Sequence, residues 1–146
     1  MSKLKKQYNI HCNIAQTLNI IGDKWTLLIL HAVKENKGTY KEIQESLPGI
    51  PTNLLSNRLK ELTEDELLEC ELYSKHPPRY RYRLTEKSLD LDDIYNALIL
   101  WGDRNLDKSY KCLSHKDCDG DIEIAYVCKS CGKIVDKKDL IIAPKE

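Results

Sequence analysis

The spacing of apolar residues predicts a series of helices in the first half of the chain. From Cys12 to Ile21, and again over 25–36 (WTLLILHAVKEN), apolar positions recur three to four residues apart, as on one helix face. The second segment is apolar on most of its circumference, which indicates a helix in the centre of a core. Gly22-Asp23 separates the two helices, because Gly ends helices and Asp caps them, and Lys37-Gly38 ends the second.

Two further helices flank a tight turn. Ile43 and Leu47 lie four positions apart on a short helix, which Pro48-Gly49 then stops. A new helix over 51–64 opens at Pro51-Thr52, because proline is tolerated in the first helical turn. Its apolar stripe, together with an apolar plug at the turn, consists of Leu55, Leu59, Leu62 and Ile50. Two short helices joined by a turn that contains Gly are typical of a helix-turn-helix.

After residue 67 the apolar positions change from a helical period to a period of two. Apolar or aromatic residues alternate with charged ones in LECELYS (68–74) and RYRYRL (79–84), which is typical of strands with one buried face. The residues expected on that face are Leu68, Cys70, Leu72, Tyr80, Tyr82 and Leu84. The prolines of the connecting KHPP mark a hairpin turn, because they cannot lie within a central strand. The predicted fold is mainly α with a small β-hairpin (α+β), a winged helix-turn-helix.

A long helix is predicted from about Glu86 to Asp107, with Thr85 as its cap. Its apolar band is wider than one core contact needs. The band consists of Leu89, Leu91, Ile94, Tyr95, Leu98, Ile99, Leu100, Trp101 and Leu106. The helix either lies between the core and the C-terminal segment or contacts a second subunit. We favour a homodimer, because helix-turn-helix proteins usually bind two half-sites.

Composition and charge narrow the partners. The 146 residues include 23 Lys plus Arg and 23 Asp plus Glu, so a net charge of zero excludes a globally basic nucleic-acid binder. No apolar run approaches the roughly 18 residues that span a membrane, and the N-terminus lacks the apolar region of a signal peptide. We therefore expect a cytoplasmic protein with reduced thiols and no membrane partner. Residues 1–11, with Lys3, Lys5 and Lys6, are expected to form a flexible basic arm.

The helix over 51–64 carries the candidate residues for reading DNA. A recognition helix places the side chains of its first turns on base edges in the major groove. The candidates are Thr52, Asn53, Ser56 and Asn57 for bases, with Arg58 and Lys60 nearer the phosphates. The alternative is an ordinary solvated helix face, but the helix-turn-helix context favours DNA contact.

The wing is the most basic stretch, because 72–85 contains no Asp or Glu. The candidate contacts to phosphates or the minor groove, within the wing residues 73–82, are Lys75, His76, Arg79 and Arg81. A turn centred on His76 would place Glu71 opposite Arg81 and Glu69 opposite Arg83, which predicts cross-strand ion pairs. The sequence therefore leaves Arg81 open between an ion pair and DNA, and favours the residues at the tip for DNA.

The last third of the chain has the spacing of a metal site. HKDCDG and CKSCGK each place two soft ligands three positions apart with Gly just beyond, which suits a structural, tetrahedral zinc ion. The expected ligands are His115, Cys118, Cys128 and Cys131, with Cys112 as a substitute for His115. A short tail has little core, so metal would supply much of its folding energy. We therefore expect a zinc-ribbon-like extension over 108–146, forming a short zinc-knuckle hairpin.

Other roles for the cysteines are less favoured. Cys128 and Cys131 could form a dithiol redox pair, but no βαβ pattern precedes them. A Cys112–Cys118 disulfide is disfavoured in a reducing compartment. Cys70 lies on the alternation expected to be buried in the wing and is interpreted as a packing residue.

Residues 12–107 resemble the HxlR-type winged helix-turn-helix transcriptional regulators. The matching stretches are Cys12, GDKWTLLIL (22–30), LPGIPTNLLSNRLKEL (47–62), HPPRYRYRLTE (76–86) and Leu100-Trp101-Gly102. The resemblance implies a homodimer, with the terminal helices at its interface, that binds palindromic operator DNA. It also implies a sensor of oxidants or reactive electrophiles at Cys12, because several members use the matching cysteine in this way.

The residues around Cys12 allow two interpretations. A helix N-terminus and nearby cations favour a thiolate, and Cys12 has His11 beside it with Lys5 and Lys6 close in sequence. The alternative is a small buried hydrophobe, which is the more common environment of a free cysteine.

The chain also departs from the family pattern. It has Thr39-Tyr40 where the family usually has Arg-Phe, which removes a phosphate contact. It has Glu66 and Ser88 where the family has Gly, and Cys70 where Arg is common. We expect altered turns on either side of the wing.

The leading hypothesis is a dimeric, DNA-binding transcriptional regulator that is not an enzyme. A second hypothesis is a winged-helix protein-interaction module that uses its metal-bound tail as the contact surface. A third, a thiol enzyme using Cys12 or the Cys128 and Cys131 pair, lacks a positioned catalytic base in the sequence.

Overall fold

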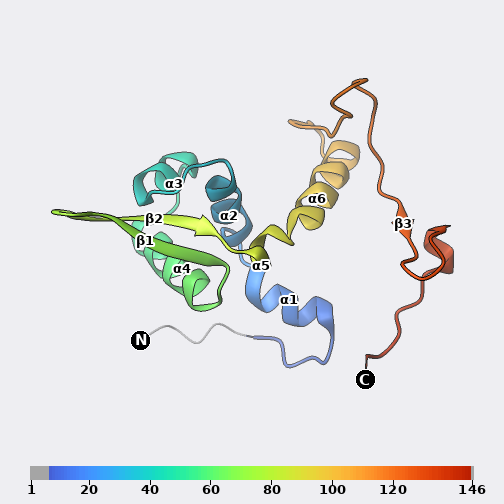
Figure 1. Ribbon diagram of the computed structural model, residues 1–146, viewed down its shortest axis with the longest axis horizontal. Coiled ribbons are helices and arrows are strands. Elements are labelled where there is room, and N and C mark those ends of the chain that lie inside the picture. The colour runs from blue at the N-terminus through green and yellow to red at the C-terminus, as the bar shows by residue number, and fades with distance from the viewer. Residues whose placement is uncertain (1–6, 146) are drawn as a thin grey trace. The chain divides into compact units, whose positions relative to one another are not determined.

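The first part of the chain combines helices with one β-hairpin in the order that the apolar spacing predicts (Figure 1). The computed structural model describes residues 7–145, and the chain forms two units, one ending at Leu91 and one beginning at Asp92. The first unit contains α1 (Asn13–Ile21), α2 (Thr26–Lys34), α3 (Tyr40–Ser46), α4 (Thr52–Glu64), β1 (Leu68–Lys75), β2 (Pro78–Leu84) and α5 (Glu86–Leu89). The α3–turn–α4 segment is the predicted helix-turn-helix and the β1–β2 hairpin is its wing, which confirms the fold class.

The core of this unit is built from the inward faces of α2, α3 and α4. Its most buried apolar side chains in these helices, each at most 2% exposed, are Ile29, Leu30, Ile43, Leu55, Leu59 and Leu62. Burying one such side chain contributes about 1.5–3 kcal/mol, so this set fixes the angle between the helices. Ile50 is buried too, as predicted for the plug at the turn. Gly49 takes a φ of +88° in that turn, a conformation that glycine adopts readily.

The wing has the predicted register. β1 and β2 pair antiparallel with Glu71 opposite Arg81, and the register shifts between Leu72 and Ser74. In Figure 1 the tip of this hairpin projects beyond the helices of the unit. The shift therefore affects the outer half of the wing, where the candidate DNA contacts lie.

Gly38 attaches the loop between α2 and α3 to the wing. The Tyr82 N–H donates a hydrogen bond to the Gly38 carbonyl oxygen at 2.7 Å, and Thr39 forms a bridge with Arg81. A Cβ at Gly38 would lie 2.7 Å from the Tyr82 carbonyl oxygen, too close for any other residue without a shift of backbone. The glycine that the sequence marks as a helix end is thus also a point of close backbone approach.

The prediction of a continuous buried face on the wing is wrong. Leu68 at the base is 2% exposed, but Leu72 and Tyr80 are 45% and 50% exposed, and Cys70 is exposed as well. The reason is that β1 contacts α4, and β2 contacts α2 and α5, while the outer hairpin extends past these helices. Cys70 is therefore not the buried packing residue that the alternation predicts.

Two positions that depart from the family pattern flank the wing. Glu66 takes a φ of +60°, the left-handed backbone that glycine adopts most readily and that costs other residues about 1–2 kcal/mol. Ser88 is 3% exposed, and its hydroxyl donates to the Thr85 carbonyl oxygen at 3.0 Å. Both residues are therefore accommodated locally within the fold.

The predicted long helix from Glu86 to Asp107 is wrong in one respect, because it is two helices. α5 ends at Leu89 and α6 (Asp92–Asn105) begins after Asp90 and Leu91. Asp92 and Asp93 lie in the first turn of α6, where negative charge interacts favourably with the helix dipole. The acidic LDLDD segment therefore starts a new helix, which periodicity alone does not show.

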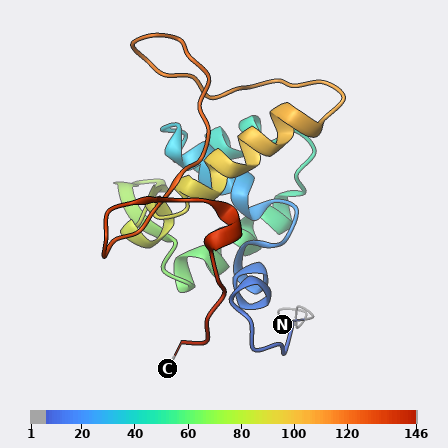
Figure 2. The ribbon, with the colours of Figure 1, turned by 90° about the vertical axis from the view of Figure 1, so that its right-hand side faces the viewer.

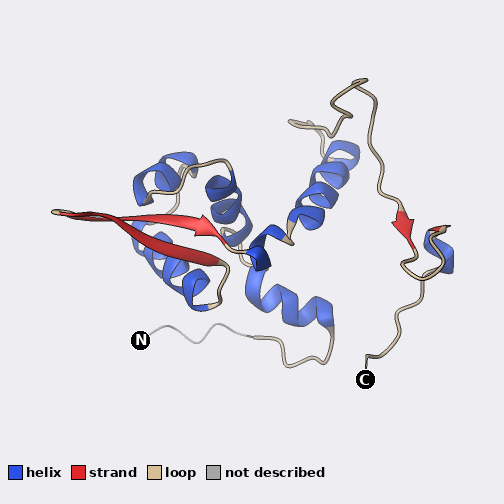
Figure 3. Cartoon of the chain, viewed as in Figure 1, coloured by secondary structure: helices blue, strands red, loops and turns tan. Residues whose placement is uncertain are grey.

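The second unit consists of α6 and a tail with little regular structure (Figures 2 and 3). The tail contains β3 (Tyr126–Val127), β4 (Ile134–Val135) and a 3-10 turn over Lys137–Asp139. β3 and β4 pair antiparallel as a very short hairpin. Among the described residues, every helix is too short or too polar to cross a membrane.

The N-terminal arm is only partly described. The Tyr8 N–H donates to Asn19 Oδ1 at 2.8 Å, and Gln16 Nε2 donates to the Ile10 carbonyl oxygen at 2.8 Å. Residues 8–10 are therefore held against α1, and the prediction of a flexible arm is wrong for them. The basic residues of the arm, Lys3, Lys5 and Lys6, lie outside the described residues.

Candidate nucleic-acid interface

One face of α4 is polar and exposed. The exposed candidates on this helix are Thr52, Asn53, Ser56, Asn57 and Lys60. They lie opposite the buried leucine stripe, so burial of that stripe fixes which side chains α4 presents to a partner. The helix begins at Thr52 after Pro51, which has extended backbone and no side-chain cap. The N-terminal turns of α4 thus present hydroxyl and amide groups, the donors and acceptors that read base edges.

α3 is attached to the start of α4 by a contact that the sequence reasoning missed. The Tyr40 hydroxyl donates to the Thr52 carbonyl oxygen at 3.0 Å. Thr39 and Glu42 form a capping box, with the Glu42 N–H donating to Thr39 Oγ1 at 3.2 Å and the Thr39 N–H to Glu42 Oε2 at 3.1 Å. The T-x-x-E spacing of these residues is the signal that could have revealed the cap. Thr39-Tyr40 therefore contributes to positioning the recognition helix.

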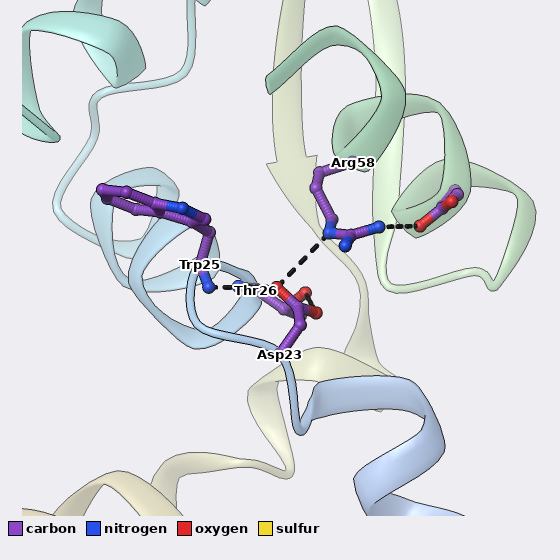
Figure 4. Close-up of polar contacts among 5 residues, drawn as sticks. Asp23, Trp25, Thr26 and Arg58 are labelled. Atoms are coloured by element: carbon purple, nitrogen blue, oxygen red, sulfur yellow. Dashed lines mark hydrogen bonds and ion pairs between the residues drawn. The ribbon is translucent and has the colours of Figure 1, made fainter. Parts of the chain in front are cut away.

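Arg58 does not belong to the predicted DNA contacts. Its side chain is 14% exposed, and its Nε lies 3.3 Å from Asp23 Oδ1 while its Nη1 lies 2.6 Å from Glu61 Oε2 (Figure 4). Figure 4 shows the guanidinium of α4 pointing toward the loop between α1 and α2, where Asp23 lies. Arg58 therefore joins the recognition helix to the α1–α2 loop, and its assignment to the phosphates is corrected.

Asp23 is the second half of this junction. Its Oδ1 accepts hydrogen bonds from the Trp25 and Thr26 N–H groups, each at 3.0 Å, and its Oδ2 accepts one from the Thr26 hydroxyl. These bonds confirm the prediction that Asp23 caps the next helix. Burial raises the pKa of this carboxyl, but the hydrogen bonds from Thr26 and Trp25 and the Arg58 charge outweigh it, so the pKa is lowered overall.

The tip of the wing presents exposed cations. Lys75, His76 and Arg79 are exposed, and Lys75 pairs with Pro78 at the hairpin turn. Within residues 7–145, neither Lys75 nor Arg79 has an ion-pair partner. These side chains can therefore approach the phosphate backbone or enter a minor groove without first breaking a contact.

The predicted cross-strand ion pairs are wrong, although the register is right. Arg83 Nη2 lies 2.9 Å from Glu71 Oε2, which is a diagonal pair between residues that do not face each other directly. Strand twist and long side chains bring such diagonal neighbours into reach. Arg81, which faces Glu71, instead lies with its guanidinium carbon 5.8 Å from the centre of the Tyr73 ring.

Arg81 also acts on α3. Its charge, together with hydrogen bonds from Thr39, lowers the pKa of Glu42. Arg81 is half-buried, so it belongs to the base of the wing more than to its tip. Lys75, His76 and Arg79 remain the more accessible candidates for DNA.

Cys12 lies where the sequence predicts, immediately before α1. It has extended backbone, it is exposed, and its carbonyl oxygen accepts the first helical hydrogen bond from the Gln16 N–H at 3.0 Å. His11 beside it is exposed as well. The interpretation of Cys12 as a small buried hydrophobe is therefore wrong, and its thiol is accessible to solvent.

The predicted metal ligands form two pairs. His115 Nδ1 lies 3.1 Å from Cys118 Sγ. Backbone N–H groups of Cys131 and Ser130 point to the Cys128 sulfur and lower the pKa of that thiol. In the described part of the chain no group of three or more His, Cys, Asp or Glu side chains is close enough to hold a metal ion. Cys112 is exposed and reduced.

Comparison with known proteins follows this geometry. Residues 20–110 match the family described as HxlR-like helix-turn-helix. The chain is 36% identical over 106 residues to the protein MalR of Fusobacterium mortiferum, covering 72% of this chain and 100% of MalR.

Solved structures show the same likeness. The crystal structure of PA1607 superimposes with a TM-score of 0.76 at 26% identity, over 94% of this chain and 97% of that one. The redox regulator HypR in its reduced form superimposes with a TM-score of 0.59 at 32% identity, over 66% of this chain and 95% of HypR. With its helix-turn-helix, its wing and these relatives, the chain belongs to the HxlR-like helix-turn-helix family of transcriptional regulators.

Proposed function

We propose that the protein is a homodimer that binds a palindromic operator and responds to oxidants or electrophiles through Cys12. α4 lies in the major groove, and the wing contacts the minor groove or phosphates on either side. The observation that carries this proposal is the pairing of an exposed polar face on α4 with exposed cations at the wing tip. Net neutrality makes non-specific DNA binding weak, so affinity rests on these few contacts.

The wing tip provides a direct test. After selection of bound sites from random DNA, we expect Arg79→Ala to weaken binding to the selected site and to reduce the salt dependence by about one ion per protomer. The physical reason is that each phosphate contact releases condensed counterions. Fluorescence anisotropy at several salt concentrations measures both quantities.

Arg83→Ala is the matched control for this test. It removes the same charge from the same strand, but Arg83 is paired with Glu71. We expect Arg83→Ala to change the salt slope less than Arg79→Ala does. If selection yields no preferred site and binding has no salt dependence, the protein-interaction module becomes the better function.

Dimerisation rests on apolar faces that have no partner in the described chain. On α1, Ile14 and Leu18 are 67% and 44% exposed; on α6, Leu98 and Trp101 are 52% and 58% exposed. No residue of α6 is buried. An isolated helix of this length is marginal in water, so α6 needs a covering surface. We assign that surface to a second copy of the chain, as the two half-sites of a palindrome require.

Cys12 carries the proposed regulation. Its thiolate adds to a ring carbon of a quinone, forming an S–C bond while the quinone oxygen takes up the proton. With an oxidant such as diamide, two thiols lose two electrons and two protons to the oxidant and become a disulfide. We expect either reagent to weaken operator binding by the wild type and to leave binding by Cys12→Ser unchanged, as measured by gel shift.

Cys70→Ser is the control, because Cys70 is also exposed and reduced. We expect this variant to keep the wild-type response. Equal loss of DNA binding by Cys12→Ser and the wild type would remove Cys12 as the sensor.

A further inference from the structure

The C-terminal tail contains two turns of the same geometry. In the first turn, Ser114 and Asp121 form an isolated bridge that closes the loop. The His115 N–H donates to the Gly120 carbonyl oxygen at 2.8 Å, and the Asp119 N–H donates to the His115 carbonyl oxygen at 2.8 Å. His115 is therefore the first residue of a turn closed by two hydrogen bonds.

The second turn repeats this pattern thirteen positions later, from 115 to 128. Val127 pairs with Ile134, as Ser114 does with Asp121. The Cys128 N–H donates to the Lys133 carbonyl oxygen at 2.9 Å, and the Gly132 N–H donates to the Cys128 carbonyl oxygen at 2.8 Å.

The backbone at the end of each turn also agrees. Asp119 has a φ of +57° and Gly132 has a φ of +73°, so both turns finish in the left-handed region. A non-glycine residue there carries a cost, which indicates that the turn geometry itself is required at Asp119. The bridge, the two hydrogen bonds and the left-handed residue thus recur in both turns.

We infer that the two turns together form one zinc site with His115, Cys118, Cys128 and Cys131 as ligands. In each turn the ligands occupy the first and fourth positions, so His115 corresponds to Cys128 and Cys118 to Cys131. One nitrogen and three sulfur ligands suit a closed, tetrahedral structural site. Such a site leaves no position for substrate.

The same correspondence excludes Cys112 as the fourth ligand. Cys112 lies three residues before the first turn, and the residue at the corresponding place before the second turn is Ala125. The sequence alone left His115 and Cys112 as alternatives. The repeated turn distinguishes them, because only His115 occupies a ligand position.

The His115 side chain fits this assignment. Its Nδ1 lies 3.1 Å from Cys118 Sγ, close to the roughly 3.5 Å edge of a tetrahedron with Zn–N about 2.05 Å and Zn–S about 2.3 Å. Its Nε2 lies 3.7 Å from Asp117 Oδ2. A carboxylate beside the second ring nitrogen orients a ligating histidine, so Nδ1 is the ligand atom.

Binding of zinc would join the two turns. The nine residues between Cys118 and Cys128 can span at most about 30 Å, enough for the chain to fold back. The tail has little core to hold the turns together, since Val127 and Ile134 are 62% and 76% exposed. Metal binding supplies the missing energy in small domains of this kind.

Zinc content of the full chain tests the site. Purified without chelator, the wild type is expected to contain one zinc per chain by mass spectrometry, and Cys118→Ser and Cys131→Ser at least tenfold less. Cys112→Ser is the matched control and is expected to keep the metal. Less than about a tenth of an equivalent in the wild type would overturn the proposal, and so would loss of zinc in Cys112→Ser.

Cobalt(II) identifies the ligands even where a variant folds poorly. The thiolate-to-cobalt absorption of the cobalt-substituted wild type should match three sulfur ligands and be unchanged in Cys112→Ser. His115→Cys should retain the metal with absorption increased by about one third, since a fourth thiolate is added. An absorption that falls in Cys112→Ser, or that stays the same in His115→Cys, would overturn the ligand assignment.

Discussion

Leu98→Asp is expected to convert the dimer to a monomer and to weaken operator binding by about 10²- to 10⁴-fold. Leu98 is 52% exposed and lies on one α6 face with Ile94 and Trp101. A carboxylate at this position would have to lose its water within an apolar interface, at a cost of several kcal/mol. A monomer then binds each half-site separately and loses the effective concentration that links them. Sedimentation velocity and DNA titration measure the two effects.

Asn96→Asp is the control for this variant. It adds the same charge to α6 about half a turn away, on the opposite side of the helix from Leu98. We expect Asn96→Asp to remain dimeric and to bind DNA as the wild type does. A monomeric Leu98→Asp protein with unchanged operator affinity would show that DNA binding does not need the dimer.

Arg58→Ala is expected to lower the free energy of unfolding by about 2–3 kcal/mol at neutral pH. Removing one member of a mostly buried ion pair leaves Asp23 and Glu61 without their cation, and fully buried pairs cost roughly 3–5 kcal/mol to break. Lys60→Ala is the matched control, because it removes an equal charge from the exposed face of α4 and should change stability by less than about 0.5 kcal/mol. Urea denaturation followed by circular dichroism gives both values.

The effect of Arg58→Ala should depend on pH. Because the pKa of Asp23 in the folded protein is below its ordinary value of 3.8, its ionised form is stabilising above that pH. This contribution is lost as the pH falls below 3.8 through the lowered pKa. The difference in stability between the wild type and Arg58→Ala should therefore shrink in acid. A difference that is the same at neutral pH and at about pH 3 would mean that Arg58 acts by packing alone.

Periodicity was sufficient to predict much of the fold. The leucine stripe of α4, the turn at Gly49 and the strand register all follow from patterns that local physics enforces. The exposed polar face of α4 follows as well, since burying one side of a helix exposes the other. The candidate DNA face and the ligand spacing in the tail were therefore readable from neighbouring residues alone.

Long-range contacts decided the roles of the charged residues. Arg58 and Lys60 both lie on α4 among the residues expected to be polar, but the position of the α1–α2 loop buries Arg58 against Asp23. Strand twist pairs Glu71 with Arg83 and not with the residue that faces it. No period in the sequence encodes either partner, because both depend on how separate elements meet.

The sequence by itself therefore determines the family, the helix-turn-helix with its wing, and the residue types available for DNA and metal. The tertiary structure decides which cations remain free, that the wing is exposed beyond its base, and that two turns in the tail are equivalent. The physical reason is one of range. Hydrogen bonds and apolar periodicity act over a few residues, whereas burial and charge pairing depend on contacts between distant segments.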